Sequence, residues 1–286
     1  MAAASEPFRE VLYAVSSATA QYFTPVQRAC VSNGIRMEVV ACYIHDDTAE
    51  LYVALQDLEG DRVDETTDLF DSYTIRRPYD TKATCSLVHY DASAGTAVFR
   101  IQITQWGGHP IEGSKITFQV REFLSHKTIY EDVEIPLSLS NLGQVQTQTA
   151  DNITGGSGAA SLDDAVSVLC PGAAMEGFPV KGIDLTAVGY VNGQLHVQTA
   201  VRDALQNDNH GFVQLQGREG ERLEALYTVS FCNQWEGKGR VDYQEFVFDV
   251  PEAEIGQYQL VGTFTTSNMR TEGSWSLTFP MKNLQF

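Results

Sequence analysis

Apolar and polar residues alternate along short stretches of most of the chain. Residues 35–39, 97–103 and 116–120 each place an apolar side chain at every second position. This period is typical of a β-strand with one buried face, because successive side chains point to opposite sides of a sheet. Further strands are expected at 51–55 and 129–137. The pattern predicts an all-β chain.

The first residues follow a different period. Between Glu6 and Phe23 the apolar residues recur every third or fourth position, which is helical spacing. Pro7 fits the first turn of a helix, and Pro25 lies where the helix should have ended. We therefore expect a short N-terminal amphipathic helix within residues 1–24.

Two hairpins are indicated by their turns. The polar residues 45–48 separate the apolar stretches 43–44 and 51–55. In the second half, Asn192 and Gly193 lie between two apolar stretches. Asn-Gly is a strong signal for a two-residue turn, because both residues accept a positive φ.

The second half of the chain repeats the plan of the first. Three stretches agree in order and alternation: 34–39 with 182–187, 51–57 with 197–203, and 97–103 with 243–250. Each half also closes on an apolar-Pro-apolar sequence, at 135–137 and at 279–281. Each half offers roughly six to eight short strands, as a sandwich of two sheets requires. No helix-length pattern alternates with these strands, so a parallel α/β sheet is disfavoured.

A polar stretch separates the two halves. Residues 138–165 are rich in Ser, Gln, Thr, Asn and Gly, and such a segment buries too little apolar surface to offset the entropy lost on ordering it. We interpret it as a linker. The sequence thus predicts two tandem immunoglobulin-like β-sandwich domains, at 25–137 and 166–286, behind the helix.

The charge restricts the partners. The chain has 286 residues and a formal net charge of −18 at pH 7. Such a chain repels the phosphate backbone, so nucleic acid is not an expected partner. Repulsion also disfavours direct contact with an anionic membrane surface.

Motifs for catalysis are absent from the sequence. The six histidines are scattered, and no Ser or Cys lies in a known nucleophile motif. The five cysteines form no C-x-x-C pair and are interpreted mainly as small buried hydrophobes. Trp106, Trp235 and Trp275 are expected in a core or at the rim of a sheet. We predict a non-enzymatic protein without a cofactor.

One acidic segment is a candidate calcium site, formed by Asp57, Glu59, Asp61 and Asp64. Oxygen-rich loops between strands can hold calcium. The spacing does not match an EF-hand loop, and the second half lacks most of these acids. A solvated acidic loop is therefore the preferred interpretation.

Several segments of the chain resemble one family. The segments are 33–39, 55–64, 67–73, 111–118 and 273–280, together with Trp106. They are similar to the extracytoplasmic region of membrane-anchored, anti-sigma-factor-like proteins of Gram-positive bacteria, a domain family of unknown function. The resemblance covers most of the chain from about Phe23. It implies a pair of immunoglobulin-like outer domains tethered by one transmembrane helix preceding residue 1, and it supplies no catalytic residues.

The expected function is therefore that of an extracytoplasmic sensory or interaction module, whose partner is a protein or a component of the cell envelope. Two alternatives stay open: a secreted or cell-surface module that binds a polysaccharide or wall polymer, and a purely structural spacer. A hydrolase is a further alternative, and it would require two carboxyl groups facing each other across a cleft within about 10 Å.

Overall fold

The structure, a computed structural model, describes residues 23–70, 72–140, 142–158 and 166–281. Its sheets are antiparallel throughout these ranges, which confirms the predicted all-β class. Helical structure there is limited to three 3-10 turns, η2 (Trp106–Gly108), η3 (Ala204–Gln206) and η4 (Ile255–Gln257). The helix expected within 1–24 lies outside the described residues except for its last two, and Thr24 already begins strand β1.

The chain divides into two compact units at positions that the sequence did not indicate. The first unit combines the residues up to Lys127 with those from Asn268 onward, and the second is Thr128–Ser267. The predicted boundaries, 25–137 and 166–286, differ because two long strands take part in both units.

These strands are β7 (Lys115–Glu134) and β17 (Tyr258–Pro280). β7 begins in the first unit and ends in the second, whereas β17 begins in the second and ends in the first. The stretches 116–120 and 129–137 were expected as separate strands, but β7 continues between them through His126, whose φ is 55°. A left-handed residue disturbs the alternation without ending the strand.

The apolar-Pro-apolar closing sequences consequently belong to the opposite units. Ile135 is buried in the core of the second unit, although it was expected to close the first. Phe279 and Met281 are buried in the core of the first unit. Local alternation shows that a side chain is buried, but it does not show in which core.

The predicted linker 138–165 is also wrong for its described residues, because it contains two strands of the second unit. They are β8 (Thr147–Thr149) and β9 (Ile153–Gly158). β9 pairs with β15 (Tyr227–Cys232) in antiparallel register. Ladder hydrogen bonds join backbone groups, so a polar and Gly-rich stretch can pair at the edge of a sheet.

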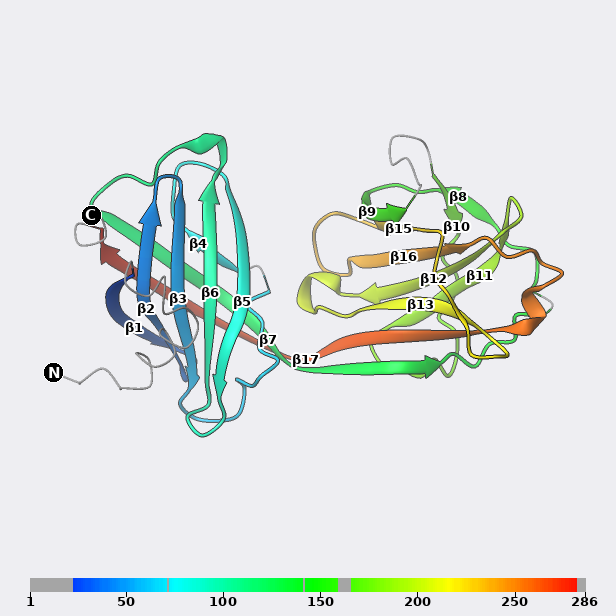
Figure 1. The fold of residues 1–286 in the computed structure, drawn as a ribbon, viewed down its shortest axis with the longest axis horizontal. Helices are drawn as coiled ribbons and strands as arrows, with labels where there is room; N and C mark the ends of the chain where they lie inside the picture. Colours follow the sequence, from blue (N-terminus) through cyan, green and yellow to red (C-terminus); the bar gives the residue numbers. More distant parts are fainter. Residues whose placement is uncertain (1–22, 71, 141, 159–165, 282–286) are drawn as a thin grey trace. The chain divides into compact units, whose positions relative to one another are not determined.

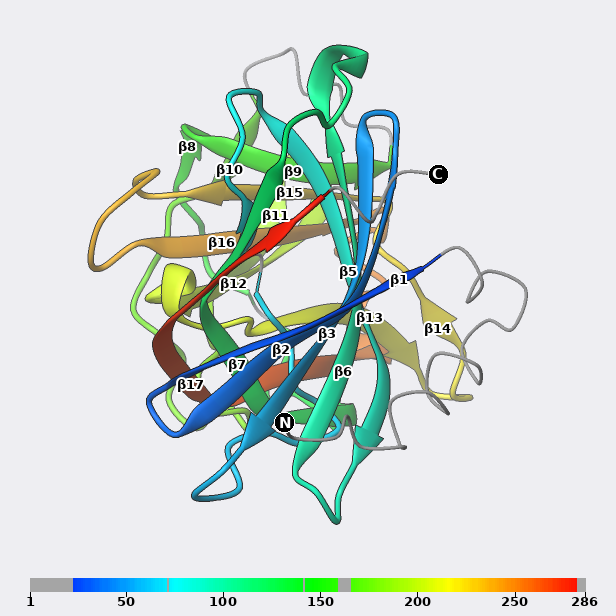
Figure 2. The ribbon, with the colours of Figure 1, turned by 90° about the vertical axis from the view of Figure 1, so that its left-hand side faces the viewer.

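The first unit has a five-stranded sheet of order β1-β2-β3-β6-β5. The strands are β1 (Thr24–Ser32), β2 (Ile35–His45), β3 (Thr48–Asp57), β5 (Thr81–Asp91) and β6 (Thr96–Gln105). Their side-by-side arrangement is visible in Figures 1 and 2. The predicted hairpin turn is confirmed, since His45 pairs with Thr48.

A second layer closes the core of the first unit. It contains β4 (Tyr73–Ile75), which pairs with β7, and the part of β17 that belongs to this unit. Side chains from both layers meet in one cluster, with Phe99 from β6, Phe118 from β7 and Trp275 from β17. All three are almost completely buried.

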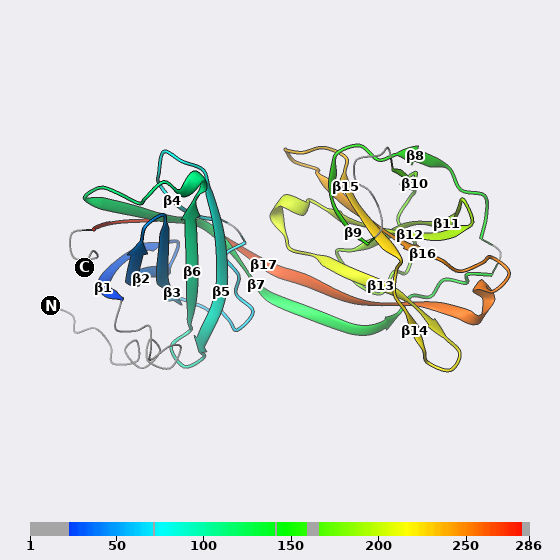
Figure 3. The ribbon, with the colours of Figure 1, turned by 45° about the horizontal axis from the view of Figure 1, so that its top comes forward.

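The second unit is also built of facing layers. Its sheet of order β11-β12-β16-β15-β9 opposes β13, β14 and the portions of β17 and β7 that lie in this unit. The strands not yet introduced are β10 (Ser167–Leu169), β11 (Asp184–Val191), β12 (Gln194–Arg202), β13 (His210–Gly217), β14 (Arg222–Leu223) and β16 (Val241–Phe248). β14 returns along β13, and β13 runs beside β17 (Figure 3).

The strand order of the two sheets repeats. β2-β3-β6-β5 in the first unit has the same sequential plan as β11-β12-β16-β15 in the second. The three pairs of matching stretches found in the sequence fall on equivalent strands of these two sheets. The Asn-Gly turn is confirmed as well, with φ of 50° at Asn192 and 86° at Gly193.

Candidate functional site

In the predicted calcium site, the Asp57 carboxylate already accepts hydrogen bonds from protein groups. The Asp57 side chain is fully buried, and Arg62 binds both of its oxygens, with Nη2 at 2.7 Å from Oδ1 and Nε at 2.9 Å from Oδ2. The backbone N–H groups of Glu59, Gly60 and Arg62 also donate to it. Burial opposes ionisation of Asp57, but the hydrogen bonds from Arg62 and from these amides hold its pKa well below its usual range.

The other three acids do not complete a ligand set. Asp64 Oδ1 accepts from Thr66 N–H at 2.9 Å, and Oδ2 accepts from His126 N–H at 3.0 Å. Glu59 and Asp61 are exposed. A calcium ion needs six to eight oxygens with free lone pairs, and no group of three potential metal-ligating side chains forms anywhere in the described ranges. The loop is held by an ion pair and amide donors instead.

A buried polar network in the second unit escaped sequence analysis. Glu245 on β16 is completely buried, and its carboxylate accepts from His196 Nδ1 at 2.6 Å and from Gln198 Nε2 at 2.9 Å. The Leu169 N–H donates to both of its oxygens. Thr186 Oγ1 completes the chain by donating to Gln198 Oε1 at 2.7 Å.

This network holds β10 against the sheet. Gln198 Nε2 also donates to the Leu169 carbonyl at 2.8 Å, so both backbone groups of Leu169 are bound by side chains of β12 and β16. Burial raises the pKa of the neighbouring Tyr227, and the Glu245 charge adds to the effect. Because protein donors occupy the Glu245 carboxylate, we assign the network a structural role.

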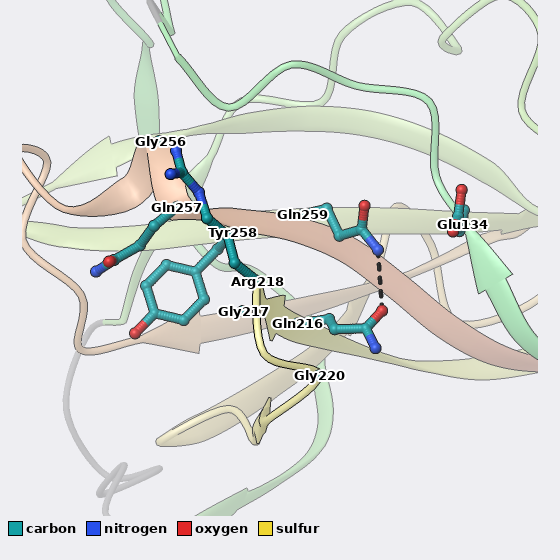
Figure 4. Close-up of a pocket in the computed structure, with 9 residues that line it drawn as sticks. All are labelled: Glu134, Gln216, Gly217, Arg218, Gly220, Gly256, Gln257, Tyr258 and Gln259. Atoms are coloured by element: carbon teal, nitrogen blue, oxygen red, sulfur yellow. Dashed lines mark hydrogen bonds between the residues drawn. The ribbon is translucent and has the colours of Figure 1, made fainter.

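The second unit also has an open polar groove of about 460 Å³ (Figure 4). Gln216 on β13 and Gln259 on β17 are register partners at its centre, and Gln259 Nε2 donates to Gln216 Oε1 at 2.9 Å. Glu134 lies on one side of this pair, whereas Tyr258 and Arg218 lie on the other. We call this site the Gln216 groove.

The Gln216 groove offers hydrogen bonds and little charge. The bond between the two carboxamides uses one N–H of Gln259 Nε2 and one lone pair of Gln216 Oε1, which leaves the Gln216 NH₂ group and the Gln259 Oε1 oxygen for a ligand. Among its lining residues, Glu134 is the only acid. The paired carboxyl groups of a glycoside hydrolase are therefore not present in this groove.

A smaller pocket, of about 230 Å³, lies in the first unit and is called the Gln105 pocket here. Gln105 ends β6 and is 2% exposed. Its Nε2 donates to the His109 carbonyl at 2.8 Å, while its buried Oε1 has no hydrogen-bond partner in the protein. The His109 ring stacks on Tyr79, with centroids 3.9 Å apart and planes 10° apart.

Arg77 supplies the second unpaired atom of the Gln105 pocket. Its Nη1 donates to the Glu112 carbonyl at 2.7 Å, and its Nη2 lies 3.7 Å from the Met281 sulfur. Its Nε is buried and has no partner in the protein. Burial lowers the pKa of Arg77.

A third pocket, of about 240 Å³ in the first unit, is lined by two acids, Glu65 and Asp68, together with a base and a thiol. Lys127 Nζ lies 2.8 Å from Asp68 Oδ2, and the Phe70 N–H donates to Asp68 Oδ1 at 3.0 Å. Cys85 also lines this pocket. The Asp68 carboxylate is thus bound by a cation and an amide, as a structural ion pair is.

The tryptophans divide into two kinds. Trp275 is a core residue, as expected, and is 1% exposed. Trp106 and Trp235 are 65% and 53% exposed. Trp106 belongs to η2, directly after Gln105, so an exposed indole follows the buried carboxamide of the Gln105 pocket in the chain. The five cysteines are all free.

Comparisons with known proteins add little to this geometry. A scan against protein-family models finds no match, and a search of curated proteins finds none either. Among solved structures, the chain is similar to the crystal structure of the conserved domain protein from Bacillus anthracis, at 10% identity over 94% of each chain and a TM-score of 0.30. A likeness at this level supports no conclusion about fold or function. None of the helical turns in the described ranges has the length and apolar character that a membrane-spanning helix requires.

Proposed function

We propose that the chain is a non-catalytic recognition module that binds a component of the cell envelope outside the cytoplasm. The observation that carries this proposal is the Gln216 groove, which is open and lined mainly by uncharged hydrogen-bonding side chains. Carboxamides both donate and accept, so they suit a ligand that presents hydroxyl or amide groups along its length. Wall polysaccharides and other wall polymers have this chemistry.

The chemistry of the Gln216 groove favours binding over turnover. A hydrolase needs a second carboxyl group or an activated nucleophile near the ligand. The groove supplies one acid, Glu134, and no cysteine, serine or histidine. The buried acids elsewhere in the described ranges, Glu38, Asp57 and Glu245, are bound by protein donors.

The family resemblance supports the same location. The segments that carry it meet in the first unit, where Trp275 Nε1 donates to the Ile35 carbonyl at 2.9 Å and Arg62 Nη1 donates to the Asn33 carbonyl at 2.7 Å. These contacts join segments far apart in the sequence into one structure. On this basis we propose that the two units are immunoglobulin-like β-sandwiches, and that the module serves a membrane-anchored, anti-sigma-factor-like protein.

Binding can be tested by sedimentation with insoluble cell walls and by titration with soluble wall polysaccharides. Gln216→Ala combined with Gln259→Ala is expected to weaken binding at least tenfold, because the carboxamide pair at the centre of the groove is lost. Gln148→Ala, on the exposed strand β8 of the same unit, is the matched control. If the wild-type protein binds no wall fraction, the recognition function is rejected and the spacer alternative is favoured.

Location has its own test. Antibodies raised against the chain are expected to label intact cells of the organism that makes it. Labelling that appears only after the cells are permeabilised would reject the extracytoplasmic placement. This result is independent of whether the Gln216 groove binds a polymer.

A further inference from the structure

We propose that the Gln216 groove binds a short peptide that carries both an ammonium and a carboxylate group, held between Glu134 and Arg218. The inference rests on the proposed function, because it concerns the same groove, and it narrows the ligand from wall polymers in general to their peptide portion. Three features of the groove favour such a ligand: opposite charges on its two sides, an oriented amide pair at its centre and a limited volume.

The groove carries one charge of each sign. Arg218 and Glu134 are the charged residues among those that line it, and the pair of Gln216 and Gln259 lies between them (Figure 4). Both charged side chains are exposed, and neither has an ion-pair or hydrogen-bond partner among the residues that the structure describes. A ligand with an anionic and a cationic group pairs with both side chains, whereas a neutral ligand pairs with neither.

The turn between β13 and β14 sets the position of Arg218. Gly217 N–H donates to the Glu221 carbonyl, and Gly220 N–H donates to the Gly217 carbonyl, both at 3.0 Å. Two acids of this turn, Glu219 and Glu221, do not line the groove. Glu221 Oε2 already accepts from the Glu219 N–H at 3.1 Å. Arg218 is therefore the group of the turn that meets an anionic group of a ligand.

The carboxamide pair at the centre of the groove has a direction. Gln259 Nε2 donates to Gln216 Oε1, so the two amides are joined head to tail. Gln259 Oε1 is the acceptor at one end of this pair, and the Gln216 NH₂ group is the donor at the other. Both residues line the groove, with Gln259 exposed and Gln216 half-buried, so a ligand in the groove reaches them. A peptide group has one N–H and one C=O, which complement this acceptor and donor.

The volume of the groove suits a few residues. Its volume of about 460 Å³ falls within the roughly 300–1,000 Å³ of sites that bind small molecules. An extended peptide rises about 3.3–3.6 Å per residue, so the charges at its two ends lie apart, as Glu134 and Arg218 do in Figure 4. Tyr258, on the Arg218 side, adds an aromatic surface for an apolar side chain.

The test is isothermal titration calorimetry of the full chain with alanine peptides of about two to five residues that have free termini. Peptides of at least one length should bind. N-acetylation or C-amidation of that peptide should each weaken binding roughly threefold or more, as expected for an ion pair partly open to solvent. Added salt should weaken binding as well, because exposed ion pairs are screened. The neutral oligosaccharide cellotetraose should bind more weakly than the free peptide.

Single-charge variants assign each end of the peptide. Arg218→Gln should make binding insensitive to C-amidation, and Glu134→Gln should make it insensitive to N-acetylation. Lys181→Gln and Glu131→Gln are the matched controls, because both positions are exposed charged residues of the second unit that do not line the groove. Both controls should keep the response of the wild type to each blocked terminus. Thermal unfolding of the four variants checks that the fold is kept.

The inference is overturned if no alanine peptide binds, if free and blocked peptides bind equally, or if cellotetraose binds more tightly than every peptide. It is also overturned if Arg218→Gln and Glu134→Gln respond to the blocked termini as the controls do. These outcomes leave the proposed function standing as long as the protein sediments with cell walls. A protein that sediments with no wall fraction fails the proposed function, and the inference fails with it.

Discussion

The Trp275 indole Nε1 donates to the carbonyl oxygen of Ile35 at 2.9 Å, although 240 positions separate the two residues. Both side chains are buried in the core of the first unit. Ser274 N–H donates to Ser32 Oγ at 3.0 Å beside this contact. The end of β17 is thereby fixed to the turn between β1 and β2.

Trp275→Phe is expected to lower the free energy of unfolding by about 1–3 kcal/mol. Phenylalanine keeps an aromatic ring in the core but leaves the Ile35 carbonyl without its donor. Urea unfolding measures the change, and Trp235→Phe is the control because Trp235 is 53% exposed. Equal stability of the two variants would show that the Nε1–H bond contributes nothing measurable.

Asp57→Asn should destabilise the protein in a pH-dependent way. The pKa of Asp57 is lower in the folded protein than in the unfolded chain, because the bonds from Arg62 and the loop amides outweigh the effect of burial. The ionised carboxylate therefore stabilises the fold fully above about pH 4, the ordinary pKa of aspartate, and this stabilisation is lost as the pH falls through the folded-state pKa.

At pH 7 the loss in Asp57→Asn is expected to be about 2 kcal/mol, the value of a hydrogen bond to a charged group. The difference from the wild type should shrink as the pH is lowered below about 4. Asp61→Asn changes an exposed neighbour in the same loop and serves as the control. A difference that stays constant between neutral and acidic pH would contradict the ion-pair assignment.

Glu245→Gln should weaken the attachment of β10 to strands β12 and β16. The substitution exchanges an acceptor oxygen for an NH₂ group facing the donors His196 Nδ1, Gln198 Nε2 and Leu169 N–H. We expect a loss of about 3 kcal/mol, as when one partner of a buried pair is removed. Hydrogen exchange should accelerate at the Leu169 amide. Glu236→Gln, at an exposed position, should exchange like the wild type there.

Gly193→Ala should destabilise the hairpin of β11 and β12. Gly193 has a φ of 86°, where a left-handed backbone costs an L-residue roughly 1–2 kcal/mol. The neighbourhood is otherwise open, because an added Cβ at Gly193 meets no atom within 4 Å. Gly155→Ala has the same open surroundings without the positive φ, so thermal unfolding of that control should change much less.

The local features of the fold could be predicted from the sequence because they depend on neighbouring residues. Alternation identified the core strands, and Asn192 with Gly193 identified a turn. Strand β1 was missed because its residues are mostly exposed or half-buried and show no clear alternation. The sequence did not show that β7 and β17 each run through both units, because this depends on which distant strand each segment pairs with.

The sites were less predictable than the fold. The acids near Asp57 attracted attention as a sequence cluster, yet Arg62 in the same stretch neutralises the buried one. Glu245, His196 and Gln198 lie on two strands and are adjacent only through the register of β12 and β16. The one local signal for the Gln105 pocket was a glutamine at a strand end followed by Trp106 and two glycines, which by itself indicates only a turn.

The path of β17 has a consequence for biosynthesis. A ribosome completes Thr128–Ser267 before it adds the residues that carry Trp275 and Phe279 to the core of the first unit. The second unit is therefore fully synthesised before the first unit is, although the first unit begins earlier in the chain. Nascent chains truncated before Asn268 would leave β2 without its indole partner, so the first unit depends on residues that are translated after the second unit.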